Sequence, residues 1–163
     1  RVTIEYPMRL TELLSEERVA VRHVDATHPL DKPKTLRILA EMLAHGARAE
    51  VSAVERVLTE REQLQSTGIG EGVAIPHGAL PNLETQFAGL LIVPEGVDFA
   101  AIDGLSVTLL FAVITPKRAT GEHLKTLARV SRLLRNKAFR DRLVTVASPK
   151  EAYALISNEE GDR

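Results

Sequence analysis

Two long apolar runs constrain the fold of this chain more than any other feature of its sequence. Residues Phe87 to Val93 and Thr108 to Ile114 are almost continuously apolar. A strand with one face in water would alternate apolar and polar residues, so these runs predict central strands that are covered on both faces. Helical patterns surround both runs, and their order predicts a central sheet with helices on both of its faces.

Two helices are expected before the glycine-rich centre of the chain. Asp31 can cap the first one, which we expect to end before Gly46. Its inward face is predicted to carry Leu36, Ile38, Leu39, Met42 and Leu43. Ser52 is the expected cap of the second helix, which should end near residues 61–64 and place Arg61 beside the glycines.

Further elements are expected at both ends of the chain. Residues 19–24 alternate and predict an edge strand. A long helix should start near Glu122, and a capping box formed by Ser148 and Glu151 should open a last helix. The inward face of the long helix is expected to carry Leu124, Leu127, Val130, Ser131 and Leu134. A stripe of arginines is interpreted as a solvated helical face, since no aromatic residues interleave with Arg129, Arg132, Arg135, Arg140 and Arg142.

Composition excludes several classes of function. The 21 basic and 22 acidic residues give a net charge of −1, so no basic field would attract nucleic acid or an anionic membrane. The chain has no cysteine, which excludes disulfides, thiolate catalysis and cysteine-ligated zinc. No apolar run approaches the roughly 20 residues that span a bilayer. We therefore expect a cytoplasmic protein without direct membrane insertion.

The chain is predicted to form one domain. Residues 1–7 differ in character from the rest of the chain and are expected to be an N-terminal extension or an expression remnant. Residues 8–158 should form the single domain, and residues 159–163 are polar and expected to be a frayed tail.

The stretch from Ser66 to Gly78 combines flexible backbone, hydroxyl groups and a titratable nucleophile. Its alternating glycines, Gly68, Gly70 and Gly72, can turn several backbone N–H groups toward one anion. Residues 73–75 predict a short buried strand, which Pro76 ends. His77 should therefore be presented at the strand end, with no side chain at Gly78 to crowd it.

This stretch does not fit the common nucleotide-binding loops. It has no lysine and runs into a strand, so it is not a Walker phosphate loop. The glycines precede the strand, so it is not a dinucleotide fingerprint either. An ordinary glycine-rich hairpin with an incidental histidine remains open on these residues alone.

Residues 59–78, TEREQLQSTGIGEGVAIPHG, resemble the phosphorylation-site signature of the phosphotransferase-system enzyme IIA components of the fructose/mannitol class. That class includes nitrogen-regulatory members. The similarity continues through FAAIDG from Phe99, LLFAVITP from Leu109 and HLKTLARVSRLL from His123, and covers nearly the whole chain. It implies an α/β/α sandwich with a mixed central sheet.

The resemblance also implies roles for individual residues. His77 would accept a phosphoryl group, His123 would be the second histidine that orients it, and Arg61 would be the site arginine. The hydroxyls of Ser66 and Thr67 and the amides of Gly68, Gly70 and Gly72 would bind its oxygens. Neither a cofactor nor a metal is implied.

The expected partners follow from the same resemblance. The donor would be an HPr-type phosphocarrier protein. A regulatory target protein is the preferred partner downstream, as in the nitrogen branch, and the alternative is a IIB domain that takes the phosphoryl group on a cysteine in sugar uptake. The residues flanking His77 that we expect to contribute to partner docking are Ile69, Val73, Ala79 and Leu80.

Two hypotheses from other classes of function remain. A metal hydrolase using His77 and His123 lacks an evident third ligand, because Glu71 and Glu122 have no metal-site spacing. An interaction module that keeps the fold without the chemistry is the other. The remaining histidines, His23, His28 and His45, receive no functional role.

Overall fold

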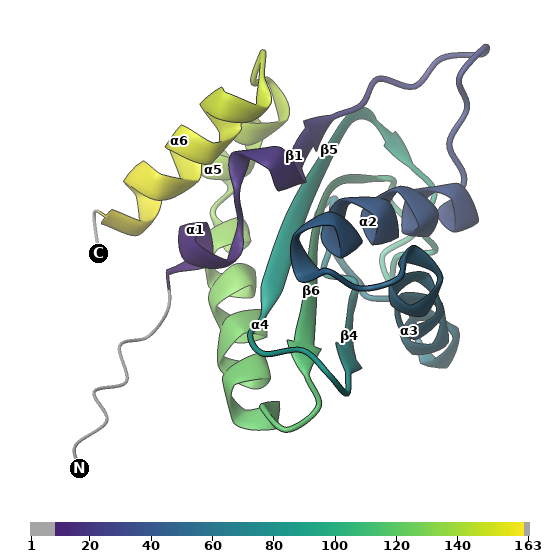
Figure 1. Ribbon diagram of the computed structural model, residues 1–163. Coiled ribbons are helices and arrows are strands. Elements are labelled where there is room, and N and C mark those ends of the chain that lie inside the picture. The colour runs from purple at the N-terminus through teal and green to yellow at the C-terminus, as the bar shows by residue number, and fades with distance from the viewer. Residues whose placement is uncertain (1–8, 162–163) are drawn as a thin grey trace.

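The computed structural model describes residues 9–161, so the expected extension at residues 1–7 lies outside the described residues. Within them, a mixed sheet has helices on both faces (Figure 1). The strand order is β1-β5-β6-β3-β2, and β4 also pairs with β6. The strands are β1 (Val19–Val21), β2 (Gly68–Gly70), β3 (Val73–Ala74), β4 (His77–Leu80), β5 (Phe87–Val97) and β6 (Val107–Pro116). β5 runs antiparallel to β6, and β2 runs antiparallel to β3. β1 pairs in parallel with β5, and β3 and β4 pair in parallel with β6.

The two apolar runs form the centre of the sheet, as predicted. Residues of β5 and β6 alternate between two hydrophobic cores, one on each face. Helices α1 (Leu10–Leu13), α4 (Thr120–Arg135), α5 (Lys137–Val144) and α6 (Pro149–Gly161) cover one face. Helices α2 (Lys32–Ala47) and α3 (Val51–Leu64) cover the other. The α/β/α sandwich is confirmed.

Helix α2 begins as predicted and ends later than predicted. The Asp31 side chain accepts a hydrogen bond from the Lys34 N–H at 2.8 Å, which confirms the cap. The helix continues through Gly46 to Ala47, and Arg48 adopts the left-handed conformation with φ 54°. A Cβ at Gly46 would lie 2.0 Å from a guanidinium nitrogen of buried Arg18. Gly46 therefore makes room for Arg18 and does not end the helix.

The expected start of α3 at Ser52 is wrong. Glu50 occupies the cap position, where its carbonyl accepts from the N–H groups of Ala53 and Val54. No side chain caps this end, so the preference of serine for cap positions did not decide the boundary.

The long helix expected to start near residue 122 is α4, and a separate helix, α5, follows it. α4 starts at Thr120, and Asn136 ends it and caps α5 by accepting from the Phe139 N–H at 3.0 Å. Arg140 and Arg142 thus belong to α5 and not to one continuous stripe. Leu124, expected inside, is 62% exposed.

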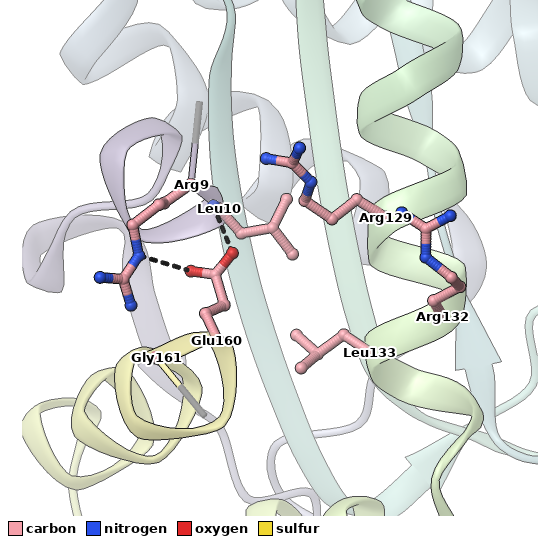
Figure 2. Close-up of a pocket in the computed structure, with 7 residues that line it drawn as sticks. All are labelled: Arg9, Leu10, Arg129, Arg132, Leu133, Glu160 and Gly161. Atoms are coloured by element: carbon pink, nitrogen blue, oxygen red, sulfur yellow. Dashed lines mark hydrogen bonds and ion pairs between the residues drawn. The ribbon is translucent and has the colours of Figure 1, made fainter. Parts of the chain in front are cut away.

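The frayed tail expected at residues 159–163 is wrong over its described part. Ser148 caps α6 by accepting from the Glu151 N–H at 3.2 Å, and the helix continues to Gly161. Glu160 accepts from the Leu10 N–H at 2.7 Å (Figure 2) and from the Thr11 N–H at 3.1 Å, which ties α6 to α1. Residues 162 and 163 lie outside the described residues. Over the part of the chain that the structure describes, no helix combines the length and hydropathy needed to cross a membrane.

Candidate functional site

Pro76 lies between β3 and β4, where its carbonyl accepts from the Val113 N–H of β6 at 2.9 Å, and His77 follows it as the first residue of β4. β3 pairs with Leu109 and Leu110 of β6, and β4 resumes the parallel pairing at Val113. His77 is half-buried and therefore less presented than expected. Its backbone is fixed by a strand, so the direction of the imidazole is set by the sheet.

Two hydrogen bonds fix the tautomer of His77. Arg61 Nε donates to His77 Nε2 at 3.2 Å, and a guanidinium can only donate. His77 Nε2 must therefore carry the lone pair. The proton resides on Nδ1, which donates to the Ile75 carbonyl at 2.7 Å. The result is a neutral imidazole with one nucleophilic nitrogen, Nε2.

The pKa of His77 is lowered from its ordinary value, chiefly because burial disfavours the charged imidazolium. The hydrogen bond to Ile75 opposes this shift, and the positive charge of Arg61 adds to it. Near neutral pH the ring therefore stays unprotonated at Nε2 and available as a nucleophile.

His123, in the first turn of α4, lies against His77. The two ring centroids are 5.3 Å apart, and the ring planes are inclined by 53°. Burial, and then the neighbouring His77, lower the pKa of His123 to about 4. Its Nδ1 is buried and has no hydrogen-bond partner. Because a buried N–H without an acceptor is rarer in proteins than an unpaired acceptor, we assign the proton of His123 to Nε2.

Arg61 lies in the last turn of α3 and bridges two groups. Besides its contact with His77, its Nη1 donates to the Gln65 carbonyl at 2.8 Å. The structure therefore brings together the two histidines and the arginine that the sequence singled out, from α3, β4 and α4.

The glycine-rich segment is a β-hairpin formed by β2 and β3, not an amide cradle around His77. Gly70 and Gly72 have φ values of 98° and 78° and form its turn with Glu71. Neither glycine lines the pocket of His77. Gly70 instead borders a second pocket, beside Arg135 and Arg140. The expectation that these two glycine amides bind the phosphoryl oxygens is not supported by their positions.

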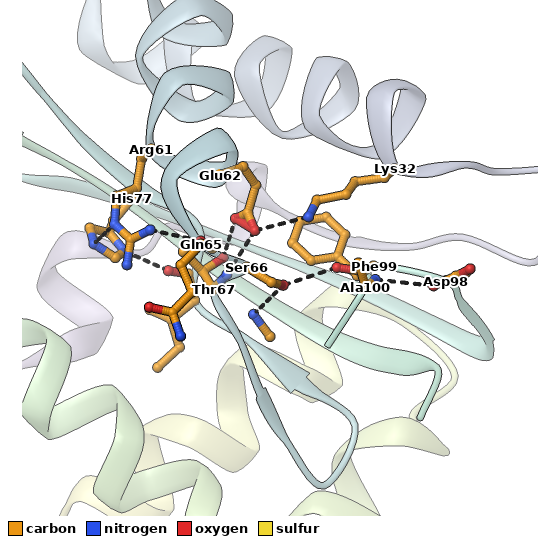
Figure 3. A network of polar contacts seen from close by, with 12 residues as sticks. Lys32, Arg61, Glu62, Gln65, Ser66, Thr67, His77, Asp98, Phe99 and Ala100 are labelled. Atoms are coloured by element: carbon orange, nitrogen blue, oxygen red, sulfur yellow. Dashed lines mark hydrogen bonds and ion pairs between the residues drawn. The ribbon is translucent and has the colours of Figure 1, made fainter. Parts of the chain in front are cut away.

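The hydroxyl and amide donors nearer His77 already have acceptors. The N–H and hydroxyl of Thr67 both donate to Glu62. The Ser66 hydroxyl donates to the Phe99 carbonyl at 3.0 Å and accepts from the Gly68 N–H at 3.1 Å. Ser66, Thr67 and Gly68 do line the pocket of His77, but as a clamped segment and not as free donors (Figure 3).

The expected docking residues separate into exposed and buried ones. Ile69 is 45% exposed, whereas Val73 and Leu80 are 2% and 7% exposed and pack in the cores. The docking role of Val73 and Leu80 is therefore wrong, and Ala79 is only half-buried in β4. Ile102, which the sequence reading missed, is 67% exposed and lines the same pocket of about 300 Å³. We call Ile69 and Ile102 the apolar rim.

Sequence reasoning also missed Glu62 and Lys32. Glu62 is buried, accepts both Thr67 donors and pairs with Lys32 at 3.2 Å (Figure 3). One signal was available: Glu62 follows Val54 and Leu58 at intervals of four, on the buried face of α3. Nothing local predicted the partner, which comes from the start of α2.

Among residues 9–161, no group of three or more histidine or carboxylate side chains lies close enough together to hold a metal ion.

The chain thus folds as an α/β/α sandwich in which a neutral histidine lies beside an arginine and a second histidine. The chain belongs to the family described as phosphoenolpyruvate-dependent sugar phosphotransferase system, EIIA 2, whose model matches residues 12–159.

Relatives and solved structures agree with this assignment. A nitrogen regulatory protein of Bradyrhizobium diazoefficiens is 35% identical over 150 residues, covering 92% of this chain and 95% of the relative. One of Escherichia coli is 34% identical, covering 94% and 93%. The crystal structure of nitrogen regulatory protein IIA-Ntr from Neisseria meningitidis is similar at a TM-score of 0.82 and 31% identity, covering 90% and 98%.

Proposed function

We propose that this chain is a phosphohistidine carrier that accepts a phosphoryl group from an HPr-type protein on His77 and acts as a phosphorylation-dependent regulator of the nitrogen-branch type. The observation that carries the proposal is the Arg61 contact, which leaves the lone pair of His77 on Nε2, in a residue that lines a pocket together with Arg61. Membership of the EIIA 2 family supports the chemistry, and the relatives named nitrogen regulatory protein support the regulatory role.

The transfer step breaks one N–P bond and forms another. The lone pair of His77 Nε2 attacks the phosphorus of the donor's phosphohistidine, and the donor imidazole leaves with the electron pair of the broken bond. His77 keeps its proton on Nδ1, held by the Ile75 carbonyl. No acid or base has to remove a proton from His77 before the attack.

Arg61 and His123 can stabilise the charge of the transferred group. Arg61 Nε donates to the lone pair of Nε2, so this hydrogen bond breaks as the phosphorus arrives, and the released guanidinium N–H groups are close enough to bind the equatorial oxygens. The proton assigned to His123 Nε2 makes that imidazole a neutral donor beside the same group. With the donors of Thr67 and Ser66 engaged elsewhere, these two side chains would do most of the oxygen binding.

Intact mass spectrometry tests the proposal. The chain is incubated with phosphoenolpyruvate and the general phosphotransferase proteins, and the wild type should gain the mass of one acid-labile phosphoryl group. His77→Ala should gain none. His45→Ala, which removes a histidine at the end of α2, is the matched control and should be labelled like the wild type. Labelling of His77→Ala, or mapping of the phosphate to His123, would contradict the proposal, and an unlabelled wild type would indicate an interaction module.

A sugar-specific IIA subunit is the alternative, favoured by the family's description as part of a sugar phosphotransferase system. The two functions differ in what receives the phosphoryl group. Loss of the label from the phosphorylated chain to a IIB cysteine would favour the sugar role, whereas retention in the presence of IIB domains would favour the regulator.

A further inference from the structure

We infer that Glu62 is a positioning residue for the phosphoryl-acceptor site: its buried carboxylate fixes the segment Gln65–Thr67, and Gln65 in turn holds Arg61 against His77. This inference rests on the proposed function for its rate measurements, and its structural part can be tested without any phosphoryl transfer.

Glu62 lies in a buried environment that disfavours a charged carboxylate unless its oxygens have hydrogen-bond or ion-pair partners. It is 7% exposed and is the only acidic residue in the buried core of residues 9–161. It also lies in the last turn of α3, at the negative end of the helix dipole. Both burial and the dipole disfavour its charge, so compensation must come from its contacts.

The contacts of Glu62 use both of its oxygens. Oε1 accepts from the Thr67 N–H at 2.7 Å and forms an ion pair with Lys32 Nζ at 3.2 Å, and Oε2 accepts from the Thr67 hydroxyl. One side chain thus binds the backbone and the side chain of Thr67 together. This fixes the orientation of the peptide that enters β2.

The position of Thr67 is connected to that of His77 through Gln65 and Arg61. Gln65 ends α3 in an extended conformation, with φ −170° and ψ 143°, and lies two residues before Thr67. Its carbonyl accepts from Arg61 Nη1 at 2.8 Å, and Arg61 Nε donates to His77 Nε2 at 3.2 Å. Ser66, between them, is held by the Phe99 carbonyl, so the whole segment is clamped (Figure 3).

Lys32 compensates the buried charge of Glu62. Lys32 reaches from the first turn of α2, pairs with Glu62 and lies 4.7 Å from the centroid of the buried Phe99 ring. The charge of Glu62 is thereby matched from α2, so the carboxylate can stay charged while it holds Thr67.

Rates of phosphoryl transfer test the positioning role. Glu62→Gln should lower the rate about ten- to hundredfold, the loss typical when a reacting group is misplaced by about 1 Å. Glu60→Gln, an exposed glutamate two residues away in α3, is the control and should keep the wild-type rate. In an Arg61→Ala background the Glu62→Gln change should cost about twofold at most, because the contact it supports is already gone. A wild-type rate in Glu62→Gln, or an equal loss in both backgrounds, would overturn the inference.

Thr67 gives a second route if Glu62→Gln does not fold. Thr67→Val removes only the hydroxyl donor and should also slow transfer, and Thr67→Ser should restore most of the rate. If Val and Ser give the same rate, the clamp is not what positions Arg61.

Nitrogen NMR of the unphosphorylated protein separates this inference from the proposed function. In the wild type the Arg61 Nε–H should exchange slowly with water and His77 Nε2 should resonate as an unprotonated acceptor. Glu62→Gln should speed that exchange about tenfold or more, whereas Glu60→Gln should not change it. An unlabelled wild type with this NMR result would refute the phosphocarrier and keep the positioning role. Unchanged exchange in Glu62→Gln would refute the positioning role whatever the labelling shows.

Discussion

At the scale of single residues, His77 and His123 share a half-buried space in which neither ring readily takes up a proton. The pKa of His77 is lowered by burial first, and the pKa of His123 falls to about 4 through burial and the neighbouring His77. Both rings are therefore neutral in the folded protein near pH 7. The unfolded chain, in contrast, protonates its histidines at about pH 6.5.

This difference predicts a pH-dependent stability. Since the folded-state pKa is the lower one, the stabilisation is fully present above pH 6.5 and is lost as the pH falls toward about 4. Between pH 6.5 and about 4, the unfolding free energy of His123→Asn should therefore fall by less than that of the wild type. Urea unfolding at several pH values measures this free energy, with His45→Asn as a control that should follow the wild type. Identical pH slopes for His123→Asn and the wild type would show that the His123 pKa is not depressed.

At the scale of elements, β4 packs closely against α3 at Gly78, the one residue of β4 without a side chain. A Cβ at Gly78 would lie 2.9 Å from Val57 Cγ2 and 3.3 Å from the Val57 carbonyl carbon. The sequence reading took Gly78 as space for the imidazole of His77. In the structure it is space for a helix, and the close approach sets how near Arg61 on α3 comes to His77 on β4.

Gly78→Ala should therefore overpack the contact between α3 and β4 and destabilise the protein by about 1–3 kcal/mol. Val57→Ala in the same chain should recover part of the loss, because the nearest atoms belong to the Val57 side chain. Gly121→Ala, in the first turn of α4 with nothing within 4 Å of the added Cβ, is the control and should be neutral or slightly stabilising. Urea midpoints that agree for Gly78→Ala and wild type would show that α3 can move aside.

At the scale of the complete fold, the site opens on a surface that a partner protein can cover. The chain carries a net charge of −1, so long-range attraction contributes little and recognition has to be local. The apolar rim beside His77 offers such a local surface. A transient transfer complex is expected to bury less than about 1,200 Å², so a single rim residue can carry much of the binding.

Ile69→Asp should weaken phosphoryl transfer from the donor protein by raising the apparent KM. His77 should stay reactive toward a small phosphoryl donor, and the melting temperature should barely change because Ile69 is 45% exposed. Leu105→Asp provides the matched control, since Leu105 is 58% exposed but does not line the pocket of His77. A collapse in melting temperature, or equal transfer defects in the two variants, would place the docking surface elsewhere.

Amino-acid patterns alone specified the centre of the sheet and the candidate reacting groups. Runs without polar alternation require coverage on both faces, which defined β5 and β6 and the layers around them. Arg61, His77 and His123 were singled out by local pattern and resemblance, and the structure places them together, although their roles remain proposals. The single domain over residues 8–158 likewise remains a prediction.

Packing between distant segments determined which side chains face the pocket and what holds them. Val73 and Leu80 point inward while Ile69 points outward, because the faces of two- to four-residue strands depend on their pairing and not on a readable period. Ile102 is exposed in the turn between β5 and β6. The glycine segment is a hairpin clamped by Glu62, whose partner Lys32 lies 30 residues earlier in the chain. Local sequence reports burial through periodicity, but contacts between distant segments arise only when two helices pack on the same sheet face.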